Sequence, residues 1–221
     1  AEGEASPLFF RKSRFEVVRW KQHWLSDTPE VPGSKFAGAG CTRVVTCAHL
    51  KQTDGLELVA FNTHLDHMTS GGTFAIQAGQ ASILTRLIDD FCGADKLPRM
   101  IMGDFNSPRT LGAPPTLVSA GYDDCSAGDD TETFVEFNDS LLNSGPINHI
   151  DWIFIRDITC CSYSVLNGKY VHSNGQQRRN LSDHVAISAR LRLPGASTAS
   201  PCSAPSIHYI SSLCARPRPA S

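Results

Sequence analysis

The stretch LELVAFNTHLDH, residues 56–67, joins a run of apolar residues to a polar ending. Residues 56–62 form a short and mostly apolar run, which predicts a buried β-strand. Asn62, His64, Asp66 and His67 follow where that strand is expected to end. The sequence therefore predicts that hydrogen-bonding and titratable side chains lie at the edge of a sheet.

Three other segments combine an apolar run with the same kinds of polar residue. The segment GDFN, residues 103–106, follows a predicted strand over 99–102, and SDH, residues 182–184, precedes one over 185–193. The segment NHIDWIF, residues 148–154, leads into a predicted strand over 150–155. Because strand ends at one edge of a sheet converge in space, we expect the four segments to form one site.

The rest of the pattern indicates a mixed α and β fold. Residues 73–91 predict an amphipathic helix, because four apolar side chains recur at helical spacing: Leu84, Leu87, Ile88 and Phe91. A shorter helix is predicted over 115–120, with proline at its start and Gly121 just past its end. Strands and helices alternate in the middle of the chain and strands cluster later. We therefore expect an α/β or α+β domain with a mixed sheet or two stacked sheets.

The composition supports a globular domain and excludes some classes of protein. The chain has 221 residues, 41% of them hydrophobic, and a formal net charge of −2, which does not favour a general nucleic-acid coat. No apolar run approaches the roughly 20 residues that a membrane helix needs. None of the eight cysteines lies in a Cys-x-x-Cys pair, so we favour mostly reduced thiols over a disulfide framework or a zinc site. The compartment stays open.

Each polar segment, taken alone, has an ordinary structural explanation. A single histidine at a strand end is usually a surface residue or a hydrogen-bonded core residue. Asp104 and Asn106 suit a turn, and Asp183 with His184 suits a loop. Asp151 is harder to explain, since a carboxylate within an apolar run is costly to bury unless it is paired. Together these residues offer oxygen ligands suited to Mg²⁺ or Mn²⁺, and a set without thiolates fits Mg²⁺-assisted phosphoester hydrolysis better than zinc chemistry.

The order NTHLDH, GDFN, IDWIF and SDH resembles the motif order of the endonuclease/exonuclease/phosphatase superfamily, which includes the DNase I-like nucleases. The resemblance covers roughly residues 3–194, and residues 9–35 resemble a less characterised microbial branch. It implies a four-layer α/β/β/α sandwich of two packed sheets flanked by helices, with the site at one edge. It also implies metal-dependent hydrolysis of a phosphoester by an activated water.

The resemblance assigns a role to each matching residue. Asp104 resembles the residue that orients or deprotonates the attacking water, and it is a candidate metal ligand with Asp183. Asn106, which we expect on the same side of an extended segment as Asp104, resembles the amide that holds the phosphate. His184 resembles the histidine that donates to a phosphate oxygen, and Asp151 resembles its carboxylate partner.

Two further residues are candidates for binding the substrate. His64 resembles a second phosphate-binding histidine, and Arg43 is a candidate phosphate contact because an arginine fork suits phosphate. Asp66 and His67 are expected only to shape the access of the substrate. The implied substrate is a phosphoester, either a nucleic acid or a small phosphorylated molecule, and the chain is expected to be a monomer without a membrane span.

The sequence also departs from the family pattern. The family carries an Asn on its first strand and a Glu, close to Gln-Glu, that is the principal metal ligand, and neither has a counterpart here. We therefore expect residues 1–193 to form an N-terminally incomplete domain of this family and residues 194–221, rich in Ser, Ala and Pro, to be a disordered tail. A catalytically inactive, truncated relative that keeps a binding surface is the main alternative. A secreted, disulfide-stapled binding module is another.

The basic and aromatic residues near the start of the chain bear on the substrate. Basic residues alternate there with aromatic ones: Arg11, Lys12, Arg14, Arg19 and Lys21, with Phe15, Trp20 and Trp24. A nuclease would use such residues to line a nucleic-acid groove. A solvated edge strand explains them equally well.

Overall fold

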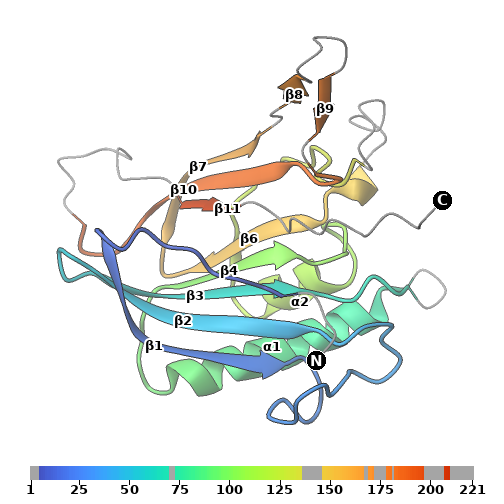
Figure 1. The fold of residues 1–221 in the computed structure, drawn as a ribbon, viewed down its shortest axis with the longest axis horizontal. Coiled ribbons are helices and arrows are strands. Elements are labelled where there is room, and N and C mark those ends of the chain that lie inside the picture. The colour runs from blue at the N-terminus through green and yellow to red at the C-terminus, as the bar shows by residue number, and fades with distance from the viewer. Residues whose placement is uncertain are drawn as a thin grey trace.

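The computed structural model describes residues 5–69, 73–135, 146–166, 169–171, 178–180, 182–196 and 207–209. A six-stranded sheet forms the centre of this part of the chain (Figure 1). Its order is β1 (Phe15–Trp24), β2 (Val44–Gln52), β3 (Glu57–His64), β4 (Arg99–Asp104), β6 (Asp151–Arg156) and β5 (Asp123–Asp124). Only β3 and β4 pair in parallel, and the other neighbouring strands are antiparallel.

The register of the central strands brings three of the predicted segments together. His64 is the last residue of β3 and pairs with Asp104, the last residue of β4. Asp104 in turn pairs with Asp151, the first residue of the antiparallel β6. Because β3 and β4 run in the same direction, both end at the same edge of the sheet, as the sequence predicted.

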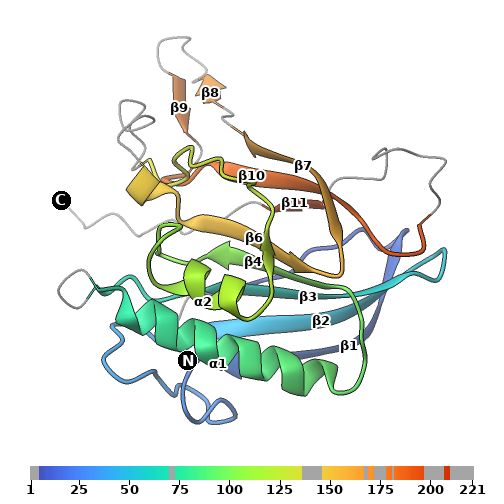
Figure 2. The same ribbon diagram turned by 180° about the vertical axis from the view of Figure 1, so that it is seen from behind.

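Helices cover one face of this sheet (Figure 2). Helix α1 (Ala75–Cys92) is the crossover between the parallel strands, and the shorter α2 (Ala113–Ser119) packs beside it. Leu84, Leu87 and Ile88 of α1 are buried in a core that includes Phe61 of β3. The apolar stripe predicted for residues 73–91 is therefore the face that α1 turns toward the sheet.

A three-stranded sheet covers part of the opposite face. Its order is β11 (Ile207–Tyr209), β10 (Ala186–Arg192) and β7 (Thr159–Leu166). Ile187, Ala189 and Leu191 of β10 are buried in a second core against residues of β3, β4 and β6. The short strands β8 (Lys169–Val171) and β9 (Arg178–Asn180) pair with each other, and the 3-10 turn η2 (Pro146–Asn148) precedes β6.

The fold class expected from the sequence is confirmed, with a difference in the number of layers. The described residues form three layers, which are the helices, the six-stranded sheet and the three-stranded sheet. Within this part of the chain no helix packs on the outer side of the second sheet. None of the described helices is long and apolar enough to cross a membrane.

Strands β1 and β2 were not predicted as elements. β2 mixes apolar residues with Thr46, His49 and Lys51, so its burial on both faces follows from its central position rather than from an apolar run. β1 is mostly exposed and lies at the edge of the sheet, which confirms the edge-strand explanation of the basic and aromatic segment. Phe15 pairs with Gln52 and Lys51 pairs with Glu57, so β1 begins at the end of the sheet opposite His64.

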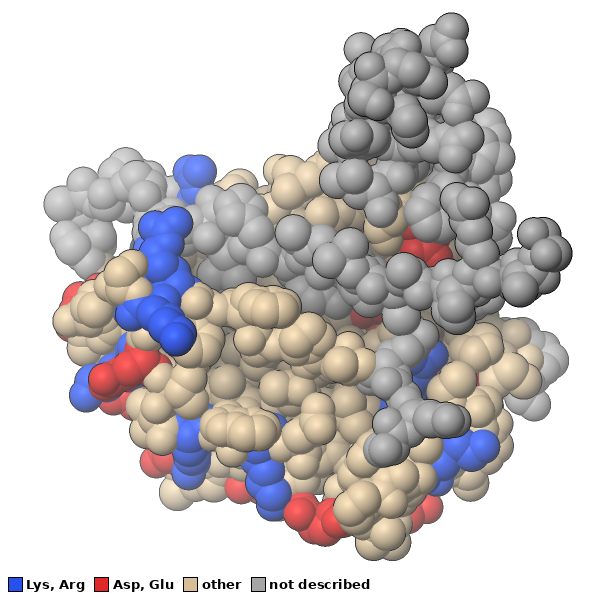
Figure 3. Space-filling model, viewed as in Figure 1, with Lys and Arg blue, Asp and Glu red and all other residues tan. Residues whose placement is uncertain are grey.

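The inner face of the six-stranded sheet is hollowed beside β10. A cavity of about 540 Å³ lies there, on the face seen in Figure 3. Its apolar lining comes mainly from three strands, with Ala48 and Leu50, Leu58 and Ala60, and Met100 and Met102. The N-terminal segment contributes Leu8 and Phe10, which are half-buried. The second sheet therefore covers only part of the apolar face available to it.

Two expectations fall partly outside the described residues. In the expected tail, residues 207–209 form β11, which differs from the predicted disorder because their backbone pairs with β10. Residues 197–206 and 210–221 of that tail lie outside the described part. Among the described cysteines, Cys41, Cys47, Cys92, Cys125 and Cys160 have free thiols, and Cys161 is disulfide-bonded.

Candidate active site

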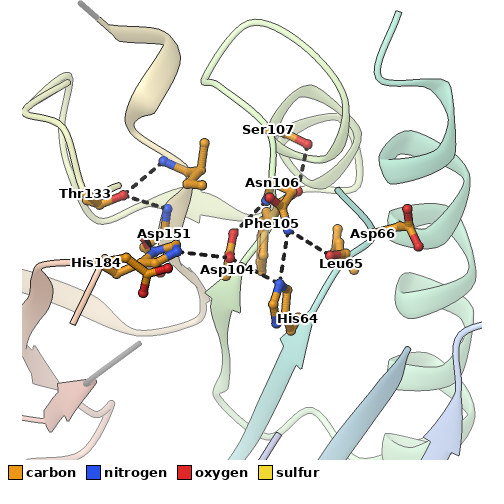
Figure 4. Close-up of polar contacts among 12 residues, drawn as sticks. His64, Leu65, Asp66, Asp104, Phe105, Asn106, Ser107, Thr133, Asp151 and His184 are labelled. Carbon is orange, nitrogen blue, oxygen red and sulfur yellow. Dashed lines mark hydrogen bonds and ion pairs between the residues drawn. The ribbon is translucent and has the colours of Figure 1, made fainter. Parts of the chain in front are cut away.

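Five of the predicted residues meet at the edge of the sheet where β3 and β4 end (Figure 4). They come from four segments that are far apart in sequence: His64 from β3, Asp104 and Asn106 from β4 and its following turn, Asp151 from β6 and His184 from the residues before β10. Gly103 allows the close approach of β3 and β4, because a Cβ at its φ of 152° would overlap the carbonyl oxygen of Thr63.

Asp104 lies at the centre of the cluster. Its Oδ2 is 3.2 Å from Nε2 of His64 and 3.6 Å from Nε2 of His184, and its Oδ1 accepts the backbone N–H of Asn106 at 2.8 Å. Only 2% of Asp104 is exposed. Burial raises its pKa, and the nearby charge of Asp151 adds to this, while the two histidines oppose it. The net effect is a carboxylate that accepts a proton more readily than an ordinary aspartate.

Asp151 and His184 form a tight pair. Nδ1 of His184 lies 2.7 Å from Oδ2 of Asp151, which is fully buried. Burial lowers the pKa of His184, but the charge and hydrogen bond of Asp151, with Asp104 and Asp183, outweigh it and raise the pKa to about 9. His184 is therefore a cation at neutral pH, with Nε2 turned toward Asp104.

Asn106 reaches the site by a different route from the one expected. We expected an extended segment, but Asn106 has a φ of 45°, in the left-handed region. The Asp104 carboxylate stabilises this turn by accepting the Asn106 N–H. The Asn106 amide Nδ2 then lies 3.0 Å from the carbonyl oxygen of Leu65 and 3.1 Å from Nε2 of His64. A tight turn, rather than the alternation of a strand, places Asn106 beside Asp104.

Asp66 is a buried anchor rather than a residue at the point of substrate access. It is fully buried, and its side chain accepts the backbone N–H groups of Cys41 and Met68, each at 2.8 Å. Burial raises the pKa of Asp66, but these hydrogen bonds and the charge of Arg43 outweigh it and lower the pKa. Arg43 is itself buried, and its charge is one of the influences that lower the pKa of Asp66. His67 is exposed.

Asp183 lies next to the cluster, directly before His184 in the chain. Its Oδ1 accepts a hydrogen bond from Ser182 Oγ at 3.1 Å, and its charge contributes to the raised pKa of His184. The described residues contain no group of three His, Cys, Asp or Glu side chains that could hold a metal ion. Both oxygens of Asp104 already face protein groups, so this part of the chain does not by itself present a metal centre.

Two residues of the cluster were missed by the sequence analysis. Oγ1 of Thr133 accepts the backbone N–H groups of Ile150 and Asp151, each at 3.0 Å. The ring of Phe134 packs against His184 with 5.0 Å between ring centroids. No periodicity marks the segment ETF, residues 132–134, and only its contacts with distant segments reveal its place.

Comparisons with known proteins agree with the motifs and the fold. No protein-family model matches the sequence, and no curated protein matches it. Solved structures do match, among them an endonuclease/exonuclease/phosphatase family protein from Bacteroides thetaiotaomicron, with 29% identity and a TM-score of 0.72 over 82% of this chain and 67% of that one. The chain resembles the endonuclease/exonuclease/phosphatase superfamily in its fold and in the order of its motifs.

Two other solved structures extend the comparison. A mannosyl-6-phosphatase from Bacteroides thetaiotaomicron shares 28% identity at a TM-score of 0.73, over 83% of this chain and 69% of that one. The catalytic domain of human Nocturnin shares 16% identity at a TM-score of 0.61, over 83% of this chain and 61% of that one, and shows likeness of fold alone. This likeness of fold and the cluster around Asp104 together indicate the chemistry of the site.

Proposed function

We propose that this chain carries the active site of a phosphoester hydrolase, in which water attacks phosphorus beside Asp104. The observation that carries the proposal is the continuous set of contacts from Asp151 through His184 and Asp104 to His64 and Asn106. Hydrolysis of a phosphoester needs a proton acceptor for water and donors for the phosphate oxygens. This cluster offers both within hydrogen-bonding reach of one another.

Asp104 is suited to accept the proton of the attacking water. Its raised pKa brings it closer to the pH at which the enzyme works, and a general base is most effective there. The Asn106 turn fixes one carboxylate oxygen, Oδ1, so Oδ2 is the oxygen that faces the two histidines. A substrate phosphate between those histidines would lie beside the water that Asp104 activates.

His184, His64 and Asn106 are suited to stabilise the phosphate. Asp151 keeps His184 protonated, so its Nε2–H can donate to a phosphate oxygen as negative charge develops in the transition state. The Asn106 amide is held by Leu65 O and lies next to His64. Donors that are fixed before the reaction stabilise a transition state without a cost of reorganisation.

Dependence on Mg²⁺ or Mn²⁺ is part of the proposal through the family resemblance. A bound cation would neutralise charge on the phosphate and lower the pKa of a coordinated water. The resemblance names Asp104 and Asp183 as carboxylates that would hold it, together with a glutamate that has no counterpart in the motifs of this sequence. Metal dependence is therefore tested by chelation, separately from the substitutions that test the residues of the cluster.

A small phosphorylated molecule is the substrate class that we favour over a nucleic acid. The basic residues Arg11, Lys12 and Arg14 precede β1, which begins at the end of the sheet opposite His64. On the face in Figure 3, lysine and arginine side chains lie among acidic ones and do not form a continuous band. The relative with 28% identity is a mannosyl-6-phosphatase, which acts on a small phosphorylated molecule.

The test compares hydrolysis of mannose 6-phosphate, p-nitrophenyl phosphate and bis(p-nitrophenyl) phosphate by the wild type and two histidine variants. His184→Ala should lower kcat on the order of a hundredfold, because it removes a transition-state donor. His49→Ala is the matched control, since His49 is also buried and paired with a carboxylate, Glu57, at 2.7 Å, but lies at the other end of the sheet. Equal rates of hydrolysis by the two variants would refute the role of His184. A wild type that hydrolyses none of the three phosphoesters would support the alternative of a binding protein without catalysis.

A further inference from the structure

The catalytic pair spans two different sheets. Asp151 is the first residue of β6 in the six-stranded sheet, whereas His184 lies just before β10 of the three-stranded sheet. Their 2.7 Å hydrogen bond therefore depends on how the ends of the two sheets are held relative to each other. A displacement of about 1 Å at such a contact is enough to lower catalysis substantially.

The segment 133–135 runs between these two sheet ends. On one side, the Thr133 carbonyl oxygen accepts the Val185 N–H at 2.7 Å, and the Val135 N–H donates to Asp183 O at 2.8 Å. Phe134 forms a bridge with His184 in the same pairing. On the other side, the Thr133 N–H donates to Asn148 O at 3.0 Å. The backbone of this segment thus joins the residues around His184 to those that lead into β6.

The hydroxyl of Thr133 is the side-chain part of this connection. Oγ1 accepts the N–H groups of both Ile150 and Asp151 at 3.0 Å, as the dashed lines in Figure 4 show. Thr133 is fully buried, so water cannot replace the hydroxyl at these two amides. The backbone pairing does not use the Thr133 side chain, whereas the fixed direction of the Asp151 backbone depends on an oxygen acceptor at Oγ1.

We propose that Thr133 is a positioning residue, which clamps the backbone of Asp151 to the segment that pairs with His184 and so sets the Asp151–His184 contact. Phe134 supports this arrangement at the His184 end, because its ring packs against the imidazole of His184. The effect on turnover rests on the proposed function, but the effect on the hydrogen bond does not. The two are measured separately.

The first measurement follows the hydrogen-bonded Nδ1–H proton of His184 by NMR in the 221-residue chain, assigned by its loss in His184→Ala. Thr133→Val keeps the shape of the side chain and removes the acceptor, and it should lose or shift this low-field proton. Thr133→Ser keeps the hydroxyl and should retain it. Thr116→Val is the matched control, because it deletes a hydroxyl that donates to the carbonyl oxygen of Gly112, the residue directly before α2.

The second measurement separates kcat from KM on the most readily hydrolysed phosphoester. Thr133→Val should lower kcat about tenfold or more with KM nearly unchanged, whereas Thr133→Ser and Thr116→Val should stay within about threefold of the wild type. A role in folding alone would lower the melting temperature of Thr133→Val and leave kcat of the folded fraction unchanged.

The proposal is overturned if the folded Thr133→Val variant keeps the His184 proton at its wild-type position, if Thr133→Ser is as impaired as Thr133→Val, or if the wild type shows no such proton. A wild type that shows the proton but hydrolyses no phosphoester would refute the proposed function. The positioning role of Thr133 would then be tested by the NMR comparison of its variants alone. Should Thr133→Val not fold, Thr133→Ala removes the same acceptor without a branched side chain and provides the same comparison.

Discussion

Asp151→Asn isolates the charge that keeps His184 protonated. The variant retains the size of the side chain and an oxygen near His184 Nδ1, but removes the negative charge that acts at 2.7 Å. Asp151 is the strongest influence that raises the pKa of His184, which otherwise is lowered by burial. We therefore expect the pKa of His184 to fall from about 9 to its ordinary value of 6.5 or below.

The size of the effect depends on pH. At pH 8, a pKa of about 9 leaves roughly 90% of His184 protonated, whereas a pKa of 6.5 leaves roughly 3%, a difference of roughly 30-fold. At pH 6, His184 is mostly protonated in both the wild type and Asp151→Asn, so the two proteins should have similar kcat values. The same pair stabilises the folded state below pH 6.5, and this contribution is lost as pH rises through about 9.

The assay combines a pH–rate profile with an NMR titration of the His184 ring protons. As the pH rises, Asp151→Asn should lose activity at a lower pH than the wild type does. The ring resonances of His184 in the variant should titrate at that same lower pH. Glu57→Gln is the control, because it removes the carboxylate partner of His49 far from the site. An unchanged alkaline limb, or a His184 titration that does not move, would refute the reasoning.

Two further predictions concern the metal and the buried Asp66. Activity should require Mg²⁺ or Mn²⁺ because the candidate ligands are oxygens, and turnover that survives thorough chelation by EDTA would contradict this. Asp66→Asn should lower the free energy of unfolding by about 2 kcal/mol at pH 7, since Asn replaces an acceptor of two backbone N–H groups. Because the pKa of Asp66 is lowered, its contribution is present above its ordinary pKa of 3.8 and lost as pH falls, so urea titrations of variant and wild type should converge in acid.

The sequence predicted the elements whose burial follows a regular pattern. The helix expected at 73–91 and the strands expected at 56–62, 99–102 and 150–155 correspond to α1, β3, β4 and β6 within a few residues. These are the elements that form the core, where apolar periodicity is strongest. β1 and β2 were not predicted, because their pairing in the sheet, rather than an apolar pattern, determines their conformation.

The sequence predicted those residues of the site that lie at the ends of strands. His64, Asp104 and Asp151 meet because β3, β4 and β6 pair in register, and that pairing could be anticipated from polar endings on apolar runs. The left-handed turn of Asn106 could not, because it depends on a hydrogen bond to Asp104. Thr133 carries no local signal, since its hydroxyl acts on amides 17 and 18 residues away.

The most direct test of the central claim compares the rates at which the 221-residue chain and its Asp104→Ala variant release product from a phosphoester, measured side by side with Mg²⁺ present. Asp104 is the residue that every other member of the cluster contacts directly or through one neighbour. We predict hydrolysis by the wild type and a loss on the order of a hundredfold or more in the variant. No hydrolysis of any phosphoester by the wild type, or equal rates for the two proteins, would contradict the assignment of this cluster as an active site.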